Sequence, residues 1–237
     1  MNDYFQFKQF RINQDRTAFK VGTDGVLLGA WVDIEQVRKV LDIGTGTGLI
    51  ALMLAQRSDA EINAIDIDET SVLQAAENIS NSPWGDRIRL FHTSFQDFVY
   101  DKPDKYDLII TNPPYFANSY KSPGHARNLS RHHISLSFHE LLKGVTEVLD
   151  TTGIFALILP VSEGEKLLRM VNSYDLFLKR RTDVIPVAGK EVNRYLMEFT
   201  NEKQVATYKN ELIIQDRISR EFTEEYKEIT RDFYIKF

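Results

Sequence analysis

In residues 41–48 the sequence reads Leu41-Asp42-Ile43-Gly44-Thr45-Gly46-Thr47-Gly48. The apolar run 37–44 before these glycines predicts a buried strand, and the apolar run 49–57 after them predicts a helix. Glycines between a strand and a helix let the chain turn sharply and let its backbone approach a ligand closely, because they have no Cβ. The stretch therefore predicts an α/β fold whose ligand lies at the end of this strand; a tight turn without a ligand is the alternative.

Strands and helices alternate along the chain after this loop. Runs rich in β-branched residues predict strands at 61–68, 87–92, 105–112 and 153–160, and helical periods predict helices at 69–80, 135–149 and 162–174. Such alternation is typical of crossover units on a parallel sheet. Two later runs, 177–187 and 192–201, are separated by too few residues for a crossover helix and predict an antiparallel hairpin at the sheet edge. The expected fold is a Rossmann-like α/β sheet of seven strands, mostly parallel, with helices on both faces.

Length and composition favour one folded domain. The chain has 237 residues, of which 43 % are hydrophobic and 27 % charged, and this balance is typical of globular proteins. We expect a single domain, 1–237, made of an N-terminal lead at 1–36, the catalytic sheet at 37–201 and a C-terminal extension at 202–237 with a helix at 223–235. The aromatic start of the lead, from Tyr4 to Phe10, is expected to be extended or strand-like. The absence of cysteine excludes thiol chemistry and fits a reducing compartment. No signal peptide or membrane-spanning run is visible, so we expect a cytoplasmic protein without a membrane partner.

The charge is distributed unevenly along the chain. The net charge is −5, but residues 31–107 carry 14 acidic and 7 basic side chains, so this segment alone has a net charge of −7. No acidic residue lies between Leu108 and His139, where four of the five histidines and three cations fall. A local basic patch can bind phosphates although the whole protein is acidic.

Acidic residues surround the glycine loop and suggest the kind of ligand. Asp66 ends the second expected strand 22 residues after Gly44, where an acid in a nucleotide-binding fold accepts hydrogen bonds from the ribose hydroxyls. Asp68 is the alternative, although it is better placed to cap the next helix. Asp42 precedes the glycines, and its charge disfavours a bound pyrophosphate but suits a cationic ligand. These residues fit S-adenosyl-L-methionine, which carries an ammonium and a sulfonium group.

Asp97 follows the third expected strand in the segment Ser94-Phe95-Gln96-Asp97-Phe98. Its carboxylate is a candidate acceptor for the amino group of an adenine ring, with Phe95 or Phe98 lining the ring. A simple cap of the local loop is the alternative interpretation.

Asn112-Pro113-Pro114-Tyr115 closes the fourth expected strand, at the edge where open α/β sheets bind their ligands. Two prolines remove backbone donors, so the Asn112 side-chain oxygen and the Pro113 carbonyl can both accept hydrogen bonds from an amino group. Tyr115 offers a flat face for stacking a base, with Phe116 as a second wall. Such a site orients an exocyclic amine toward a methyl donor and needs no general base.

Basic residues follow this tetrapeptide within one expected loop. Lys121, Arg127 and Arg131 could bind the phosphates of a flipped nucleotide, or lie in a solvated loop. The neighbouring histidines lack the acidic and cysteine partners of a zinc site, so we expect no metal ion. Cations of the hairpin form a second basic surface, which could contact RNA or protect a sheet edge; they are Lys179, Arg180, Arg181, Lys190 and Arg194.

The order DIGTGTG, AIDID, QDF and NPPY resembles the class I S-adenosylmethionine-dependent methyltransferases that act on amino groups. The flanking segment from Phe19 to Trp31 and the ending Tyr226…Asp232-Phe233-Tyr234 are similar to the bacterial tRNA(Val) adenine N6-methyltransferase family. This resemblance implies methylation of adenosine 37, next to the anticodon. It also implies that the segment around Lys20 and Thr23 folds over the methionine end of the cofactor, although a helix start capped by Asp24 is an equal alternative.

Other functions remain as alternatives. The first is a protein glutamine N5-methyltransferase acting on release factors, because the tetrapeptide also suits a planar amide. Such relatives carry an additional amino-terminal domain, whereas only about 36 residues precede the first expected strand here, and this counts against the alternative. A DNA or rRNA amino-methyltransferase is another, and a nucleotide sensor or a dinucleotide dehydrogenase fits less well. We expect a tRNA adenine-N6-methyltransferase that acts as a monomer on its tRNA partner.

Overall fold

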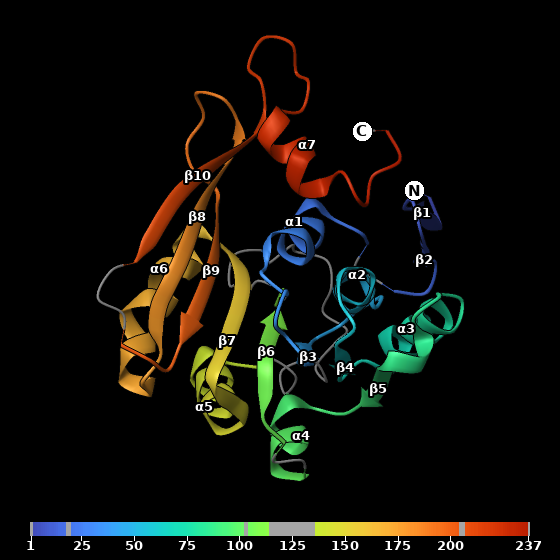
Figure 1. The fold of residues 1–237 in the computed structure, drawn as a ribbon, viewed down its shortest axis with the longest axis vertical. Helices are drawn as coiled ribbons and strands as arrows, with labels where there is room; N and C mark the ends of the chain where they lie inside the picture. Colours follow the sequence, from blue (N-terminus) through green and yellow to red (C-terminus); the bar gives the residue numbers. More distant parts are fainter. Residues whose placement is uncertain (1, 18–19, 102–103, 114–135, 204–206, 237) are drawn as a thin grey trace, which may run out of the picture.

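The structure is a computed structural model that describes residues 2–17, 20–101, 104–113, 136–203 and 207–236. Its centre is an eight-stranded sheet with the order β10-β8-β9-β7-β6-β3-β4-β5 (Figure 1). The parallel strands expected from the sequence are β3 (Lys39–Ile43), β4 (Glu61–Asp66), β5 (Ile88–His92), β6 (Tyr106–Thr111) and β7 (Leu149–Pro160). The mostly parallel α/β fold with helices on both faces is confirmed.

The carboxyl ends of the central strands meet at one edge of the sheet. Ile43 of β3 lies opposite Ile65 of β4 on one side and opposite Thr111 of β6 on the other. The residues that follow these positions therefore start their loops side by side. This register, fixed by buried apolar side chains, brings the glycine loop, Asp66 and Asn112 together.

Helices cover both faces of the sheet, and two apolar clusters lie beneath them. One cluster contains side chains of α1 (Thr23–Trp31), α2 (Leu49–Arg57), α3 (Glu69–Ser80) and α7 (Glu224–Thr230). The other contains side chains of α4 (Phe95–Asp101), α5 (Phe138–Val148) and α6 (Val161–Met170). Short 3-10 turns, Gly85–Arg87 before β5 and Val171–Tyr174 after α6, complete these connections. The helix α4, in the segment of Asp97, was not expected from the sequence.

The antiparallel hairpin is present, but it is not the sheet edge. Strand β9 (Arg194–Thr200) lies between β7 and β8 (Phe177–Val187), antiparallel to both. A further strand, β10 (Tyr208–Gln215), pairs in parallel with β8 and forms the edge. The expected count of seven strands is therefore wrong by one. The first four residues of β10 are exposed and carry no apolar alternation, so only the pairing with β8 defines this strand.

The two ends of the chain lie close together (Figure 1). The aromatic lead forms a small antiparallel pair, β1 (Tyr4–Gln6) and β2 (Arg11–Asn13), which confirms its extended conformation. The final helix α7 is shorter than the expected 223–235, because the chain turns after Thr230. Phe7 and Phe233 are both buried in the cluster on this face.

Candidate active site

The glycine turn has the backbone that only glycine adopts easily. Gly44, Gly46 and Gly48 have φ angles of 70°, 58° and 80°, all in the left-handed region. A Cβ placed on Gly44 or Gly46 would meet no heavy atom within 4 Å, whereas one on Gly48 would lie 3.5 Å from the Cβ of Ala75 in α3. The first two glycines therefore leave open space at the end of β3, and the third lets α3 pack closely.

Asp66 binds the backbone of this turn. Its Oδ2 accepts a hydrogen bond from the Gly46 amide at 2.8 Å, and its Oδ1 accepts one from the Asp68 amide at 2.9 Å. Burial raises the pKa of the Asp66 carboxyl above its usual range. Asp68 is the N-cap of α3 and accepts from the Ser71 amide at 2.9 Å, which confirms the capping interpretation. Asp66 thus lies where the sequence interpretation placed the ribose acceptor.

Asp42 is fully buried beneath the turn. The Thr45 hydroxyl donates to Asp42 Oδ2 at 2.6 Å, while Asp42 Oδ1 has no hydrogen-bond partner among the described residues. Burial, and to a smaller extent the charge of Asp66, raise the pKa of Asp42 to about 7. A buried carboxylate with an unpaired oxygen favours a nearby cation. Together with the open glycine turn, this fits a cofactor that carries positive charge and no pyrophosphate.

Asn112 lies directly beside this turn. It follows Thr111, whose side chain is buried and donates to the Ile43 carbonyl at 2.8 Å, so the ends of β6 and β3 are joined. Asn112 and Pro113 are half-buried. A Cβ placed on Gly25 of α1 would be 3.6 Å from Asn112 Nδ2, so the first turn of this helix faces the amide across a space of about one methyl group. The remaining predicted residues of the motif lie outside the described residues; they are Pro114, Tyr115 and Phe116.

The other predicted cofactor ligands lie around the same edge. Asp97 is exposed in the first turn of α4, where it accepts from the Ser94 hydroxyl at 2.6 Å and its amide donates back to that oxygen. The Phe95 and Phe98 rings are buried in the core, so the structure does not favour them as walls for an adenine ring.

The cofactor-covering segment forms the start of α1. The Lys20 ammonium donates to the Gln14 carbonyl, and Thr23 is exposed at the first residue of the helix. The N-cap is Gly22 without a side-chain hydrogen bond, so the alternative of a helix start capped by Asp24 is wrong. Asp24 instead binds Arg194 of β9 at 2.8 Å.

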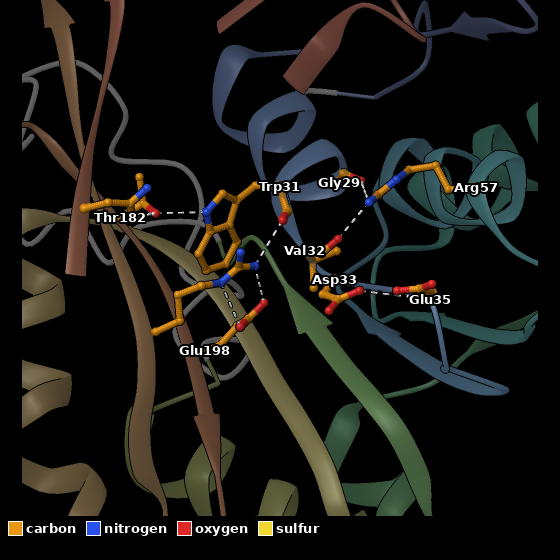
Figure 2. A network of polar contacts seen from close by, with 10 residues as sticks. Gly29, Trp31, Val32, Asp33, Glu35, Arg57, Thr182 and Glu198 are labelled. Atoms are coloured by element: carbon orange, nitrogen blue, oxygen red, sulfur yellow. Dashed lines mark hydrogen bonds and ion pairs between the residues drawn. The ribbon is translucent and has the colours of Figure 1, made fainter. Parts of the chain in front are cut away.

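The basic hairpin surface differs from the expectation. Arg180 pairs with Glu198, Arg181 with Asp183 and Arg194 with Asp24, so these cations bind neighbouring carboxylates. Figure 2 shows the first of these pairs beside Trp31 of α1. This contact between helix and hairpin could not be predicted from the sequence, because 149 positions separate the two residues along the chain. Lys121, Arg127 and Arg131 lie outside the described residues.

The described residues contain neither a cluster of candidate metal ligands nor a helix that could span a membrane. No group of three or more histidine, cysteine, aspartate or glutamate side chains there could hold a metal ion. In the same part of the chain, no helix is both long enough and apolar enough to cross a membrane.

Comparisons with known proteins identify the family. The model of the methyltransferase small domain matches residues 20–159. A protein of Bacteroides thetaiotaomicron named tRNA1(Val) (adenine(37)-N6)-methyltransferase is 45 % identical, over 99 % of this chain and 98 % of its own length. One of Christiangramia forsetii with the same name is 47 % identical, over 99 % of both chains.

Solved structures agree with this fold. A "predicted O-methyltransferase" of Agrobacterium tumefaciens superposes with a TM-score of 0.70 at 17 % identity, over 89 % of this chain and 96 % of the other. A ribosomal protein L11 methylase of Lactobacillus delbrueckii subsp. bulgaricus gives 0.56 at 17 % identity, over 79 % and 82 %. The resemblance stated from the motifs is confirmed: the chain belongs to the methyltransferase small domain family and, within it, to the bacterial tRNA1(Val) (adenine(37)-N6)-methyltransferases.

Proposed function

We propose that this protein transfers a methyl group from S-adenosylmethionine to N6 of an adenine in tRNA, namely adenosine 37 of tRNA(Val). One observation carries the proposal: Asn112 directly follows the end of β6, which is joined to the end of β3 at the glycine turn, so an amine held by Asn112 would lie next to a cofactor held by the turn. The names of relatives at 42–47 % identity over nearly the full length support the substrate.

Several residues of this chain would hold the cofactor. When bound, S-adenosylmethionine supplies an electrophilic methyl group on a sulfonium. The open backbone of Gly44 and Gly46 would accommodate its closest approach, and Asp66 would accept from the ribose hydroxyls. Asp42 would stabilise the positive charge from beneath. The remaining candidates, at the rim, are Asp97 for the adenine amino group and Lys20 or Thr23 for the carboxylate.

Asn112 and Pro113 would orient the target amine. The amine of adenine is conjugated with its ring, so its lone pair is a weak nucleophile. Hydrogen bonds from its two N–H groups to the Asn112 side-chain oxygen and the Pro113 carbonyl would direct the lone pair toward the methyl group. Tyr115 would stack on the base. Catalysis would then come from position and fixed dipoles rather than from a general base.

The proposed contacts with RNA come from the segment that follows Asn112 and Pro113. Pro114 and Phe116 would line the base pocket, and Lys121, Arg127 and Arg131 would bind backbone phosphates. The domain boundaries stay as proposed, with lead 1–36, catalytic sheet 37–201 and extension 202–237. A monomer acting on tRNA in the cytoplasm is the form we propose.

The test is methyl transfer from labelled S-adenosylmethionine to three pools in parallel: unmodified total tRNA, duplex DNA and a release-factor protein. Nucleoside mass analysis of the labelled pool should detect N6-methyladenosine in tRNA, and tRNA(Val) with adenosine 37 replaced should take no label. Label in protein alone would overturn the substrate and leave the amino-methyltransferase site intact.

A further inference from the structure

One face of the β8–β9 hairpin is directed at helix α1. Arg180 forms a fork on Glu198 at 2.6 and 2.9 Å, lies 3.8 Å over the Trp31 ring and donates to the Trp31 carbonyl (Figure 2). The Trp31 indole donates to Thr182 at 2.9 Å. The C-terminal end of α1 is therefore fixed to the hairpin by hydrogen bonds, an ion pair and a stacked guanidinium.

The N-terminal end of α1 meets the same face through an ion pair between Asp24 and Arg194. Arg194 Nε lies 2.8 Å from Asp24 Oδ2, and both side chains are about one quarter exposed, at 27 % and 24 %. Arg194 is the first residue of β9 and lies opposite Pro160, the last residue of β7. It therefore stands at the carboxyl edge of the sheet, on the side of Asn112.

Between these two ends, the helix backbone packs against the candidate active site. A Cβ placed on Gly25 would lie 3.1 Å from Leu49 Cδ2 and 3.6 Å from Asn112 Nδ2. Gly25 therefore faces the Asn112 amide with space for about one methyl group between them, so a shift of the first turn of α1 moves the wall beside that amide. The N-cap Gly22 offers no side-chain hydrogen bond that would resist such a shift.

We propose that Arg194 is a positioning residue for methyl transfer: through Asp24 it holds the first turn of α1 against Asn112 and keeps that amide aligned with the target amine. The proposal rests on the proposed function of Asn112. Because the Trp31 end stays held by Arg180 and Thr182, loss of Arg194 removes a restraint on the near end of the helix, while the buried side chains of α1 keep the fold intact. Arg194 lies beyond residues 20–159, so the family model does not include it.

The experiment compares three variants with the wild type: Arg194→Ala, Arg194→Lys and Arg181→Ala. Arg181 is a matched control, since it pairs with Asp183 on the same hairpin with 15 % and 22 % exposure but packs on Tyr195, toward α6. For each variant, kcat on tRNA, KM for tRNA, the Kd of S-adenosylhomocysteine and the melting temperature are measured. A misplacement near 1 Å costs roughly 100-fold in rate, so Arg194→Ala should lower kcat by roughly 30- to 100-fold.

If Arg194 acts by positioning, the KM for tRNA, the Kd of S-adenosylhomocysteine and the melting temperature should follow a specific pattern. For Arg194→Ala, KM and Kd should change less than about threefold and the melting temperature should match that of Arg181→Ala. Arg194→Lys keeps the charge and should recover part of kcat, and Arg194→Ala added to Asp24→Asn should lower kcat little further. A kcat equal to that of Arg181→Ala, or a loss that follows KM for tRNA alone, would overturn it. A wild type that methylates no tRNA would instead overturn the proposed function.

Discussion

The two halves of the sheet hold their helices in different ways. In the half formed by β3, β4 and β5, short loops lead into crossover helices, and apolar side chains fix the packing. In the half formed by β8, β9 and β10, the hairpin holds α1 by charged and polar side chains from distant parts of the chain. The first half is local in sequence, whereas the second depends on long-range pairs.

The two halves therefore have different tasks: one shapes the ligand-binding loop, and the other holds α1 in place. The local half shapes a loop whose glycines and carboxylates suit a ligand, at a cost in stability because Asp42 is buried without a full set of partners. The other half makes satisfied polar contacts that hold a helix in place. We therefore expect changes in the first half to alter cofactor binding. Changes in the second half should alter stability, as at Arg180, or the position of α1 beside the site, as at Arg194.

The largest effect on kcat is expected at Asn112, which follows β6 between the two halves of the sheet. Asn112→Ala should lower kcat by roughly 1,000-fold, because it removes a preorganised acceptor for the amine. The Kd of S-adenosylhomocysteine should change less than about threefold, since the glycine turn and Asp66 are untouched. Transfer of label to tRNA and calorimetric titration measure the two values. Full activity would exclude Asn112 from the mechanism and leave the comparison of the halves standing.

The second effect tests the hairpin. Arg180→Ala leaves Glu198, which is 3 % exposed, without its fork, and should lower the free energy of unfolding by roughly 2–4 kcal/mol. The loss of stacking on Trp31 acts in the same direction. Lys166→Ala, which removes a lysine that is 56 % exposed from its pair with Glu163 on α6, is the control and should cost less than about 1 kcal/mol. Equal denaturation midpoints for the two variants would contradict the role given to the hairpin.

The third effect tests the opposite half. Asp66→Ala should weaken cofactor binding by roughly 100-fold, because two charge-assisted hydrogen bonds to the ribose are lost. Asp68→Ala is the matched control: it removes the cap of α3, costs about 1 kcal/mol of stability and should leave the Kd nearly unchanged. A larger change of Kd for Asp68→Ala would assign the ribose to Asp68.

What the sequence revealed follows the same division. The glycine loop was predictable because its requirement is local: residues with positive φ between an apolar strand and an apolar helix. The order of β3 to β7 followed from the same alternation. The Asp68 cap was predictable because it binds an amide only three residues away.

The features that could not be predicted depend on contacts between residues that are far apart in the sequence. Arg194 is a cation among others in the sequence, and only the fold brings it to Asp24, 170 residues away. The strand β10 follows the same rule, since its exposed first half is a strand only by pairing with β8. The sequence does not distinguish a solvated arginine from a paired one, so the carboxylate partners of Arg180, Arg181 and Arg194 were not predictable from it.

The smallest effect is a pH dependence of cofactor binding through Asp42. Its pKa of about 7 means that the carboxyl is largely protonated at pH 6 and largely ionised at pH 8. A cationic ligand binds the ionised form more tightly, so affinity should rise as pH increases through 7 and level off above 8. The ionised fraction changes about tenfold over this range, which sets the expected change in Kd.

The variant Asp42→Asn isolates the contribution of Asp42 to the pH dependence of Kd. The titrations of the ligand and of Asp66 occur in both the wild type and the variant, so they cancel in the comparison. The amide still accepts from Thr45 and has no charge to lose, so Kd measured from pH 6 to 8 should lack the tenfold change. The variant should also be more stable than the wild type at pH 8, because folding raises the pKa of Asp42: the wild type is stabilised by the bound proton at low pH and loses that stability as pH rises toward 7. Parallel pH profiles for the two proteins would show that the ligand's charge does not face Asp42. In that case the buried carboxyl of Asp42 beneath the glycine turn would not serve to bind a cationic cofactor.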